Sequence, residues 1–302
     1  MPADQRFLLV HAHPDDECIG NAATMAKYVA AGRDVTLVTC TAGEMGEILV
    51  PELEHMASNK DDTLADQRKI ELDNAMKALG VTDYRHLGGF KRYRDSGMQW
   101  HADGHAIPAD DVHANAFWNA DLTEAASHLV EIIRETKPQV LVTYDEFGGY
   151  GHPDHIQAHR VATYAASLAA VKSYRPDLGP AHDITKIYWG AMSAAKVRQG
   201  LRDLREAGDT VTFEGMDPDN LPAFMVEDDA LSAKVEADDY AHVKMEALRA
   251  HRTQIAVDGP FFALSNNIGN EVWGTEFYRL AKGTLGPTNE QGLETDLFAG
   301  LD

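Results

Sequence analysis

Short runs of apolar residues alternate with longer amphipathic segments along much of the chain. The short runs are rich in β-branched residues and predict buried strands, whereas the amphipathic segments predict helices. Strands are expected at 6–10, 34–41, 84–87, 139–144 and 186–192, and helices at 21–31, 62–79, 122–136, 153–172 and 238–254. Strands and helices that alternate in this way imply right-handed crossovers. The pattern therefore predicts an α/β protein with a mostly parallel sheet.

Glycine and proline residues support the boundaries of these elements. Gly32 and Gly80 stand where two of the predicted helices would end, and Pro153 stands where another would begin. The segment 90–118 has no clear periodicity and is rich in His, Asp and Gly. Irregular inserts of this length are often functional. The sequence contains no repeats, and we expect one domain over residues 1–302 with irregular inserts.

The charge and cysteine content narrow the class of protein. The formal net charge of −21 disfavours binding to nucleic acid or to anionic membrane surfaces. Two cysteines, Cys18 and Cys40, are too few for a disulfide framework and suit a reducing compartment. No apolar stretch resembles a signal peptide or a membrane span. We therefore expect a cytoplasmic protein with no nucleic-acid or membrane partner; its oligomeric state is not predicted.

Two histidine- and aspartate-rich motifs follow predicted strands that are far apart in the sequence. The first is His-Ala-His-Pro-Asp-Asp-Glu at 11–17, and the second is Tyr-Gly-His-Pro-Asp-His at 150–155. In an open parallel sheet, the loops after the strand ends form the ligand crevice. Imidazole and carboxylate groups gathered there are typical ligands of a divalent metal. The sequence therefore predicts a metal-dependent enzyme.

Three residues of these motifs can bind one metal ion and leave a position open for water. They are His13, Asp16 and His155. Zn²⁺ fits this ligand set, and Fe²⁺ is possible. The Asp15 carboxylate, between two candidate ligands, is well placed to take a proton from a metal-bound water. Such a water can attack an acyl carbon at neutral pH.

Three further residues can act on the acyl group. As an imidazolium, His152 could stabilise an oxyanion or protonate a leaving amine, and Asp154 could hold His152 in the charged state. Tyr150 lies in a glycine-rich loop and could donate a hydrogen bond to the scissile carbonyl.

Simpler roles remain open for several of these residues. Asp15 or Asp16 could be only the N-cap of a helix. His11 is either a packing residue or a support for a metal ligand, and Cys18 is interpreted as a small buried residue. Eight histidines outside the motifs are assigned no chemical role: His55, His101, His105, His113, His128, His182, His242 and His251.

Together, the stretches 13–17 and 152–155 resemble the two metal motifs of the LmbE-like (PIG-L) family of N-acetylglucosaminyl deacetylases. The resemblance is greatest to the branch that hydrolyses N-acetylglucosaminyl-inositol in the mycothiol pathway. The stretches that carry this closer resemblance are 38–41, 94–98, 148–151, 263–267 and 294–296.

The resemblance implies a fold, a cofactor and a substrate. It implies a Rossmann-like three-layer fold, with zinc on His13, Asp16 and His155 and a small amino-sugar as substrate. It assigns Asp15 as the general base, and His152 and Tyr150 to the tetrahedral intermediate. Residues that match sugar and inositol contacts are Arg68, Asp95, Met98, Glu47 and Phe224.

The sequence also bears on other functions. The sister branch of mycothiol S-conjugate amidases carries a lysine shortly after the first motif and a proline after Gly-Gly-Tyr, where this chain has Ile19, Gly20 and Gly151. Another N-acetylglucosamine-containing substrate is a further alternative. Asp15 disfavours a non-catalytic binding module, since binding alone needs no base. A nucleotide-binding protein is disfavoured because no Gly-x-Gly-x-x-Gly follows the first strand. Cys18 replaces the serine expected after the first motif.

Overall fold

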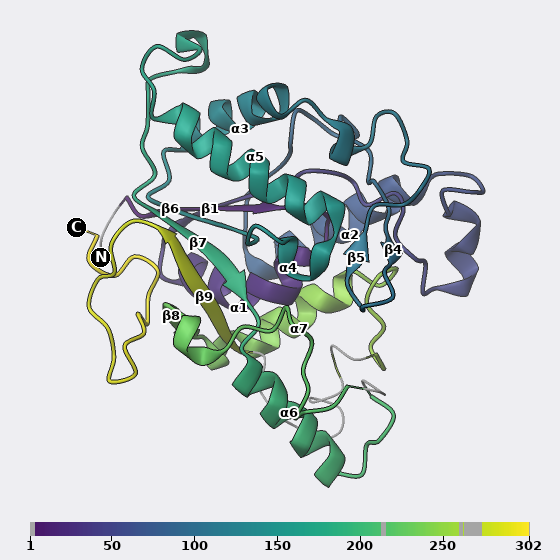
Figure 1. Ribbon diagram of the computed structural model, residues 1–302. Helices are drawn as coiled ribbons and strands as arrows, with labels where there is room; N and C mark the ends of the chain where they lie inside the picture. The colour runs from purple at the N-terminus through teal and green to yellow at the C-terminus, as the bar shows by residue number, and fades with distance from the viewer. Residues whose placement is uncertain (1–3, 213–215, 260–261, 263–273, 302) are drawn as a thin grey trace.

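The structure is a computed structural model that describes residues 4–212, 216–259, 262 and 274–301. A seven-stranded sheet in the order β3-β2-β1-β6-β7-β9-β8 lies at its centre, with helices on both faces (Figure 1). Its strands are β1 (Arg6–His11), β2 (Asp34–Thr39), β3 (Asp83–His86), β6 (Val140–Thr143), β7 (Lys186–Ala191), β8 (Ala233–Glu236) and β9 (Thr275–Lys282). A separate hairpin pairs β4 (Gln99–Trp100) with β5 (Ala106–Ile107).

Helices connect most of these strands. They are α1 (Asp16–Ala30), α2 (Leu64–Leu79), α3 (Leu122–Thr136), α4 (Gly148–Gly151), α5 (Pro153–Ala169), α6 (Ala194–Glu206) and α7 (Ala241–Ala250). Short 3₁₀ turns are η1 (Pro51–Met56), η2 (Phe117–Asn119), η3 (Pro176–Leu178), η4 (Asp228–Ala230) and η5 (Asp238–Tyr240). Among the residues described, no helix is long and apolar enough to cross a membrane.

The predicted parallel sheet is confirmed for five of the seven strands. Strand β1 pairs in parallel with β2 on one side and β6 on the other, so that Leu9 is in register with both Leu37 and Val142. Strands β3 and β7 extend the parallel part at its two ends. Strand β9 then pairs antiparallel with β7, and β8 pairs antiparallel with β9.

Side chains of β1 alternate between two hydrophobic layers, as the pleat of a strand requires. Phe7 and Leu9 are buried in a cluster with α1, α2 and α7, whereas Leu8 and Val10 are buried in a second cluster with α3 and α5. Figure 1 shows α3 and α5 on one side of the sheet and α1 and α7 on the other. The predicted three-layer α/β fold is therefore confirmed.

The order of the strands determines where a ligand can bind. Strand β1 lies between β2 and β6. Helix α1, which follows β1, packs on one face, and α5, which follows β6, packs on the other. A crevice opens outside the strand ends where consecutive connections leave in opposite directions. Both sequence motifs begin at this point.

Several boundaries differ from the prediction. Helix α1 begins at Asp16 rather than at 21, since acidic side chains such as Asp16 and Glu17 are favourable in a first helical turn. Helix α6 and strands β8 and β9 were not predicted, and the irregular segment 90–118 contains the β4–β5 hairpin. Part of the resemblance, 263–267, lies outside the described residues. The single-domain organisation stays a prediction.

A buried ion pair ties the C-terminal segment to the sheet. The Lys186 ammonium on β7 lies 2.6 Å from the Glu294 carboxylate, and both side chains are almost fully buried. The same carboxylate accepts a hydrogen bond from the Tyr188 hydroxyl, and the ammonium donates to the Ala299 carbonyl at 2.6 Å. Glu294 therefore depends on Lys186 for neutralisation of its buried charge.

We expect Lys186→Met to lower the free energy of unfolding by about 3–5 kcal/mol, because it leaves the Glu294 carboxylate buried and unpaired. Lys69→Met is the control, since it removes an exposed i,i+4 pair with Asp73 worth about 0–1 kcal/mol. Urea unfolding followed by circular dichroism measures both. Equal effects of the two substitutions would contradict this account.

Candidate metal centre and active site

The two motifs meet at the C-terminal edge of the parallel strands. His13 and Asp16 belong to the connection between β1 and α1, and His155 lies in the first turn of α5. The Asp16 carboxylate accepts a hydrogen bond from the backbone N–H of His13 at 2.9 Å, which closes the first loop into a tight turn. The first motif is thereby folded so that both side chains face the second.

The spacing of the three side chains fits a tetrahedral metal site. One Asp16 oxygen lies 3.3 Å from Nδ1 of His13, and the other lies 3.3 Å from Nε2 of His155. Two ligand atoms at ordinary bond lengths from one tetrahedral zinc ion would be about 3.3–3.4 Å apart. The two pairs therefore have the separation that shared coordination requires.

The environment of His155 assigns its metal-binding nitrogen. Nδ1 lies 3.1 Å from the carbonyl oxygen of Gly148, so it carries the proton and donates it there. Nε2 is buried and has no hydrogen-bond partner among the described residues. The lone pair of Nε2 and the neighbouring Asp16 oxygen can both bind a cation placed between them. Because Nε2 has no other partner in the described part of the chain, His155 fits the role of a metal ligand.

His13 is oriented by a buried carboxylate. Its Nε2 lies 3.2 Å from Asp154, which leaves Nδ1 turned toward Asp16. Asp154 also accepts hydrogen bonds from the Ser96 N–H at 2.9 Å and from the Ser96 hydroxyl. A carboxylate that accepts the second ring N–H of a ligand histidine fixes the ring and raises its basicity. Asp154 was expected to contact His152, and the structure places its carboxylate on His13 instead.

Tyr144, which the sequence did not single out as a site residue, holds the candidate ligand Asp16. Its hydroxyl donates to Asp16 at 2.7 Å and accepts the N–H of Ala12 at 2.9 Å, and its ring stacks on His155 with centroids 4.2 Å apart. His11 is buried, and its Nδ1 lies 3.2 Å from the same hydroxyl. His11 therefore lies behind the candidate ligands and supports them. The position of Tyr144 at the end of the predicted strand at 139–144 was the available signal.

The surroundings of His152 favour its neutral form, whereas the sequence suggested an imidazolium. It caps α5, because its Nδ1 accepts the N–H of Asp154 at 3.1 Å. Burial lowers the pKa of His152 to about 2, and the neighbouring His13 and His155 contribute in the same direction. The proton of the neutral ring is then on Nε2, which can donate a hydrogen bond. Ligand atoms of His13, His152 and His155 lie within 4.8 Å of one another, so His152 faces the same centre.

Asp15 is held against Arg68 beside this centre. Burial raises the pKa of the Asp15 carboxyl to about 6, and the Arg68 guanidinium, 3.1 Å away, limits the rise. Arg68 also donates to the carbonyl oxygens of Gly43, at 2.9 Å, and Pro14. Asp15 occupies the N-cap position of α1 but makes no side-chain capping bond. Its carboxylate is therefore not committed to helix capping.

The other residues predicted to belong to the site lie at different distances from the candidate metal centre. Asp95 is buried, with one carboxylate oxygen 3.7 Å from Nε2 of His13. The Tyr150 ring lies 5.2 Å from the ring of His155 and 6.4 Å from that of Phe224. Met98 is half-buried, three residues after Asp95, and Glu47 is exposed. The structure thus brings Asp95 and Tyr150 to the centre.

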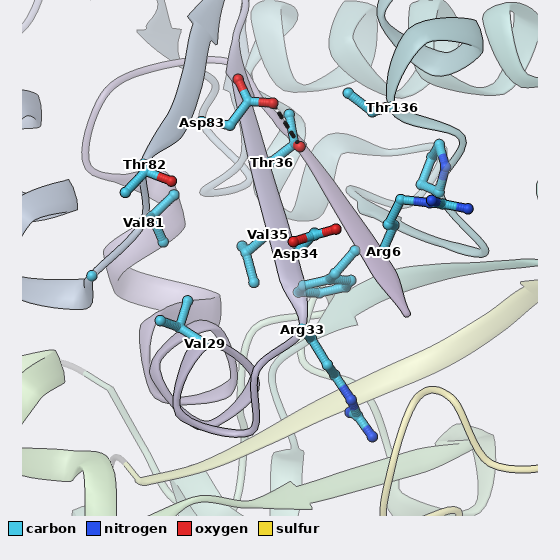
Figure 2. Close-up of a pocket in the computed structure, with 13 residues that line it drawn as sticks. Arg6, Val29, Arg33, Asp34, Val35, Thr36, Val81, Thr82, Asp83 and Thr136 are labelled. Atoms are coloured by element: carbon cyan, nitrogen blue, oxygen red, sulfur yellow. Dashed lines mark hydrogen bonds between the residues drawn. The ribbon is translucent and has the colours of Figure 1, made fainter. Parts of the chain in front are cut away.

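A pocket of about 280 Å³ lies at the opposite edge of the sheet (Figure 2). It is lined by Arg6, Asp34 and Asp83, which begin β1, β2 and β3, and by Thr36, which donates to Asp83 of the adjacent strand at 3.0 Å. It is remote from both motifs, at the strand ends where α/β folds seldom bind ligands.

Comparison with known proteins supports the resemblance seen in the motifs. Residues 8–166 match the family described as PIG-L: GlcNAc-PI de-N-acetylase. The chain belongs to this family. A PIG-L relative from Nocardioides sp. is 70% identical over 100% of both chains, and one from Kribbella flavida is 62% identical over 99% of this chain and 98% of its own. Both are named 1D-myo-inositol 2-acetamido-2-deoxy-alpha-D-glucopyranoside deacetylase.

Solved structures share the fold at low sequence identity. The N,N'-diacetylchitobiose deacetylase from Pyrococcus horikoshii is 19% identical, with a TM-score of 0.60 over 92% of this chain and 84% of its own. The 4-carboxy-2-hydroxymuconate hydratase GalB from Pseudomonas putida is 15% identical, with a TM-score of 0.58 over 94% of this chain and 99% of its own. Because a deacetylase and a hydratase share this fold, the reaction must be argued from the site residues.

The carboxylate behind His13 yields a prediction about metal affinity. We expect Asp154→Asn to weaken Co²⁺ binding about 10- to 100-fold, since it removes the charge that orients His13. Titration against a chromophoric chelator measures the change. Asp177→Asn is the control, because Asp177 pairs only with Arg175 at the surface in the contacts described. Unchanged affinity in the Asp154 variant would contradict the assignment.

Proposed function

We propose that this protein is a zinc-dependent hydrolase that removes the N-acetyl group from N-acetylglucosaminyl-inositol, giving acetate and a free amine in mycothiol biosynthesis. The observation that carries the proposal is the convergence of His13, Asp16 and His155 around one point, with Asp15 beside them. The names of relatives at 62–70% identity over nearly the whole chain support the substrate. We propose a cytoplasmic location, because Cys18 and Cys40 are both free thiols, which suits a reducing compartment.

His13, Asp16 and His155 would hold the metal. Zinc, or ferrous iron as the alternative, would polarise the acyl oxygen and lower the pKa of a bound water when present. Asp15 accepts the proton of the attacking water, because its carboxylate is fixed by Arg68 and makes no capping bond. The protonated Asp15 then delivers this proton to the leaving amine.

Two neutral donors face the position where charge develops on the acyl oxygen. The Nε2–H of His152 and the hydroxyl of Tyr150 can each donate a hydrogen bond to the oxyanion. Burial raises the pKa of Tyr150 above its usual range, so its hydroxyl keeps its proton. Because its Nδ1 accepts the N–H of Asp154 and burial favours its neutral form, we assign His152 to oxyanion stabilisation rather than to protonation of the amine.

The substrate would be bound by residues other than the metal ligands. Asp95 lies closest to the centre and would accept hydrogen bonds from sugar hydroxyls. Met98 and Phe224 would contact the apolar faces of the rings. Glu47 is exposed and would reach only the inositol side. Arg68 binds Asp15, so its part in substrate binding would be through a remaining N–H group.

The conformation of Gly151 favours the deacetylase over the S-conjugate amidase. Its φ of +97° is unavailable to proline, whose ring fixes φ near −65°. A Cβ atom there would also meet the carbonyl oxygen of Ala106 at 2.5 Å. The proline that the amidase branch carries after Gly-Gly-Tyr therefore requires a different loop from the one that bears Tyr150 here.

We expect the zinc-loaded protein to release free amine from N-acetylglucosaminyl-inositol much faster than from a mycothiol S-conjugate. We expect Asp15→Asn to lower kcat by about 10²–10⁴-fold, because the water loses its base. Metal analysis by mass spectrometry should show the same zinc content in both proteins.

Preference for the conjugate would identify an amidase and contradict the substrate assignment. Wild-type turnover in Asp15→Asn would contradict the assignment of the base. No turnover of either substrate by the zinc-loaded protein would overturn the proposed function.

A further inference from the structure

A second buried polar cluster begins at Glu17, the last residue of the first metal motif. Glu17 of α1 and His251, the residue after α7, are fully buried, and their Oε1 and Nε2 atoms are 2.9 Å apart. They are 234 positions apart in the sequence, and α7 packs on both α1 and α2. His251 was assigned no chemical role from the sequence. Its burial shows that it is not a surface histidine.

This pair is connected to the backbone of Asp15. The second carboxylate oxygen of Glu17 accepts the N–H of Asp15 at 2.9 Å. Asp15 has a φ of +121°, which is rare and costly for a residue with a side chain. The hydrogen bond to Glu17 therefore holds Asp15 at the point where its backbone is strained. Arg68 holds the carboxylate end of the same residue at 3.1 Å.

A purely structural role does not explain the choice of a charged pair. Burying an ion pair costs desolvation energy, and apolar residues of similar volume often serve stability as well or better. Glu17 uses both carboxylate oxygens at once, because Oε1 contacts Nε2 of His251 at 2.9 Å and Oε2 accepts the Asp15 N–H at 2.9 Å. The contact with His251 therefore fixes the orientation of the carboxylate that holds the Asp15 N–H.

Metal binding does not explain this cluster either. Glu17, Cys18 and His251 have ligand atoms within 4.8 Å of one another. The Cys18 thiol, however, donates a hydrogen bond to Oε1 of Glu17 at 3.1 Å, and Nε2 of His251 contacts the same oxygen at 2.9 Å. These three ligand atoms are thus paired with one another, and the other Glu17 oxygen holds the Asp15 N–H.

We propose that His251 and Glu17 are positioning residues, which hold Asp15 in its strained backbone conformation so that its carboxylate faces the attacking water. The inference rests on the proposed function, because it concerns the base of that reaction. It assigns a catalytic consequence to a histidine contributed by the C-terminal part of the chain.

The test compares disruptive and conservative variants of the two residues. We expect Glu17→Ala and His251→Leu to lower kcat about 10- to 100-fold, as a displacement of a reacting group by about 1 Å does. KM should stay within about threefold, since neither residue contacts the substrate. His251→Gln retains a donor to Glu17 and should recover most of kcat. The visible spectrum of the Co²⁺-loaded protein should not change, because the metal ligands remain in place.

Lys244→Met is the matched control. Lys244 of α7 forms an equally buried pair with Glu276, at 2.7 Å, and this pair bonds the backbone of α1 at Ala23 and Thr24 rather than at Asp15. Lys244→Met should lower the melting temperature about as much as His251→Leu does, while its kcat at 20 °C stays close to the wild-type value. If Lys244→Met loses as much kcat as His251→Leu at matched stability, the effect is general destabilisation and the inference is wrong.

Wild-type kcat in folded His251→Leu and Glu17→Ala would also overturn it. The failure of the proposed function would appear differently, as an inactive wild-type protein or an active Asp15→Asn. If His251→Leu or Glu17→Ala fails to fold, Glu17→Gln decides the question. Its amide has one acceptor oxygen and cannot serve both His251 and the Asp15 N–H, so kcat should fall. Wild-type kcat in Glu17→Gln would contradict the positioning role.

Discussion

The parallel pairing of β1 with β6 is the constraint on which the site depends. The two strands are 130 or more residues apart in the sequence, yet their register places the ends of both at one edge of the sheet. Their following helices leave toward opposite faces, so the loops between strand and helix face each other. The first loop brings His13 and Asp16, and the second brings His155. Neither loop alone supplies enough ligands for a metal ion.

Each of these three side chains is fixed by a further group that does not face the centre. Asp154 holds His13, the Gly148 carbonyl holds His155, and Tyr144 holds Asp16. Such contacts set ring orientation and tautomer before a ligand arrives, which lowers the cost of reorganisation during the reaction. The same principle extends to the base, since Asp15 is held by its neighbours at both its backbone and its carboxylate.

The sequence was sufficient for the parallel strands and for the motifs, because both are local patterns. It was insufficient where partners are distant. Strand β9 alternates buried and partly buried residues without a strong apolar run, and it is recognisable mainly by its pairing with β7. The sequence suggested an imidazolium at His152, whereas burial of the ring and the Asp154 N–H that its Nδ1 accepts favour the neutral form. His251 was left without a role because its partner, Glu17, is at the other end of the chain. Hydrogen-bond partners of this kind follow from the tertiary structure.

The most direct test of the account is anomalous X-ray diffraction at the zinc absorption edge, from crystals of the metal-loaded protein. We predict one strong peak at about 2.0–2.2 Å from nitrogen atoms of His13 and His155 and a carboxylate oxygen of Asp16. We also predict that His152 is not coordinated, with its Nδ1 still accepting the backbone N–H of Asp154. A peak bound by His13, His152 and His155 without Asp16, or one at Glu17 and His251, would contradict this account.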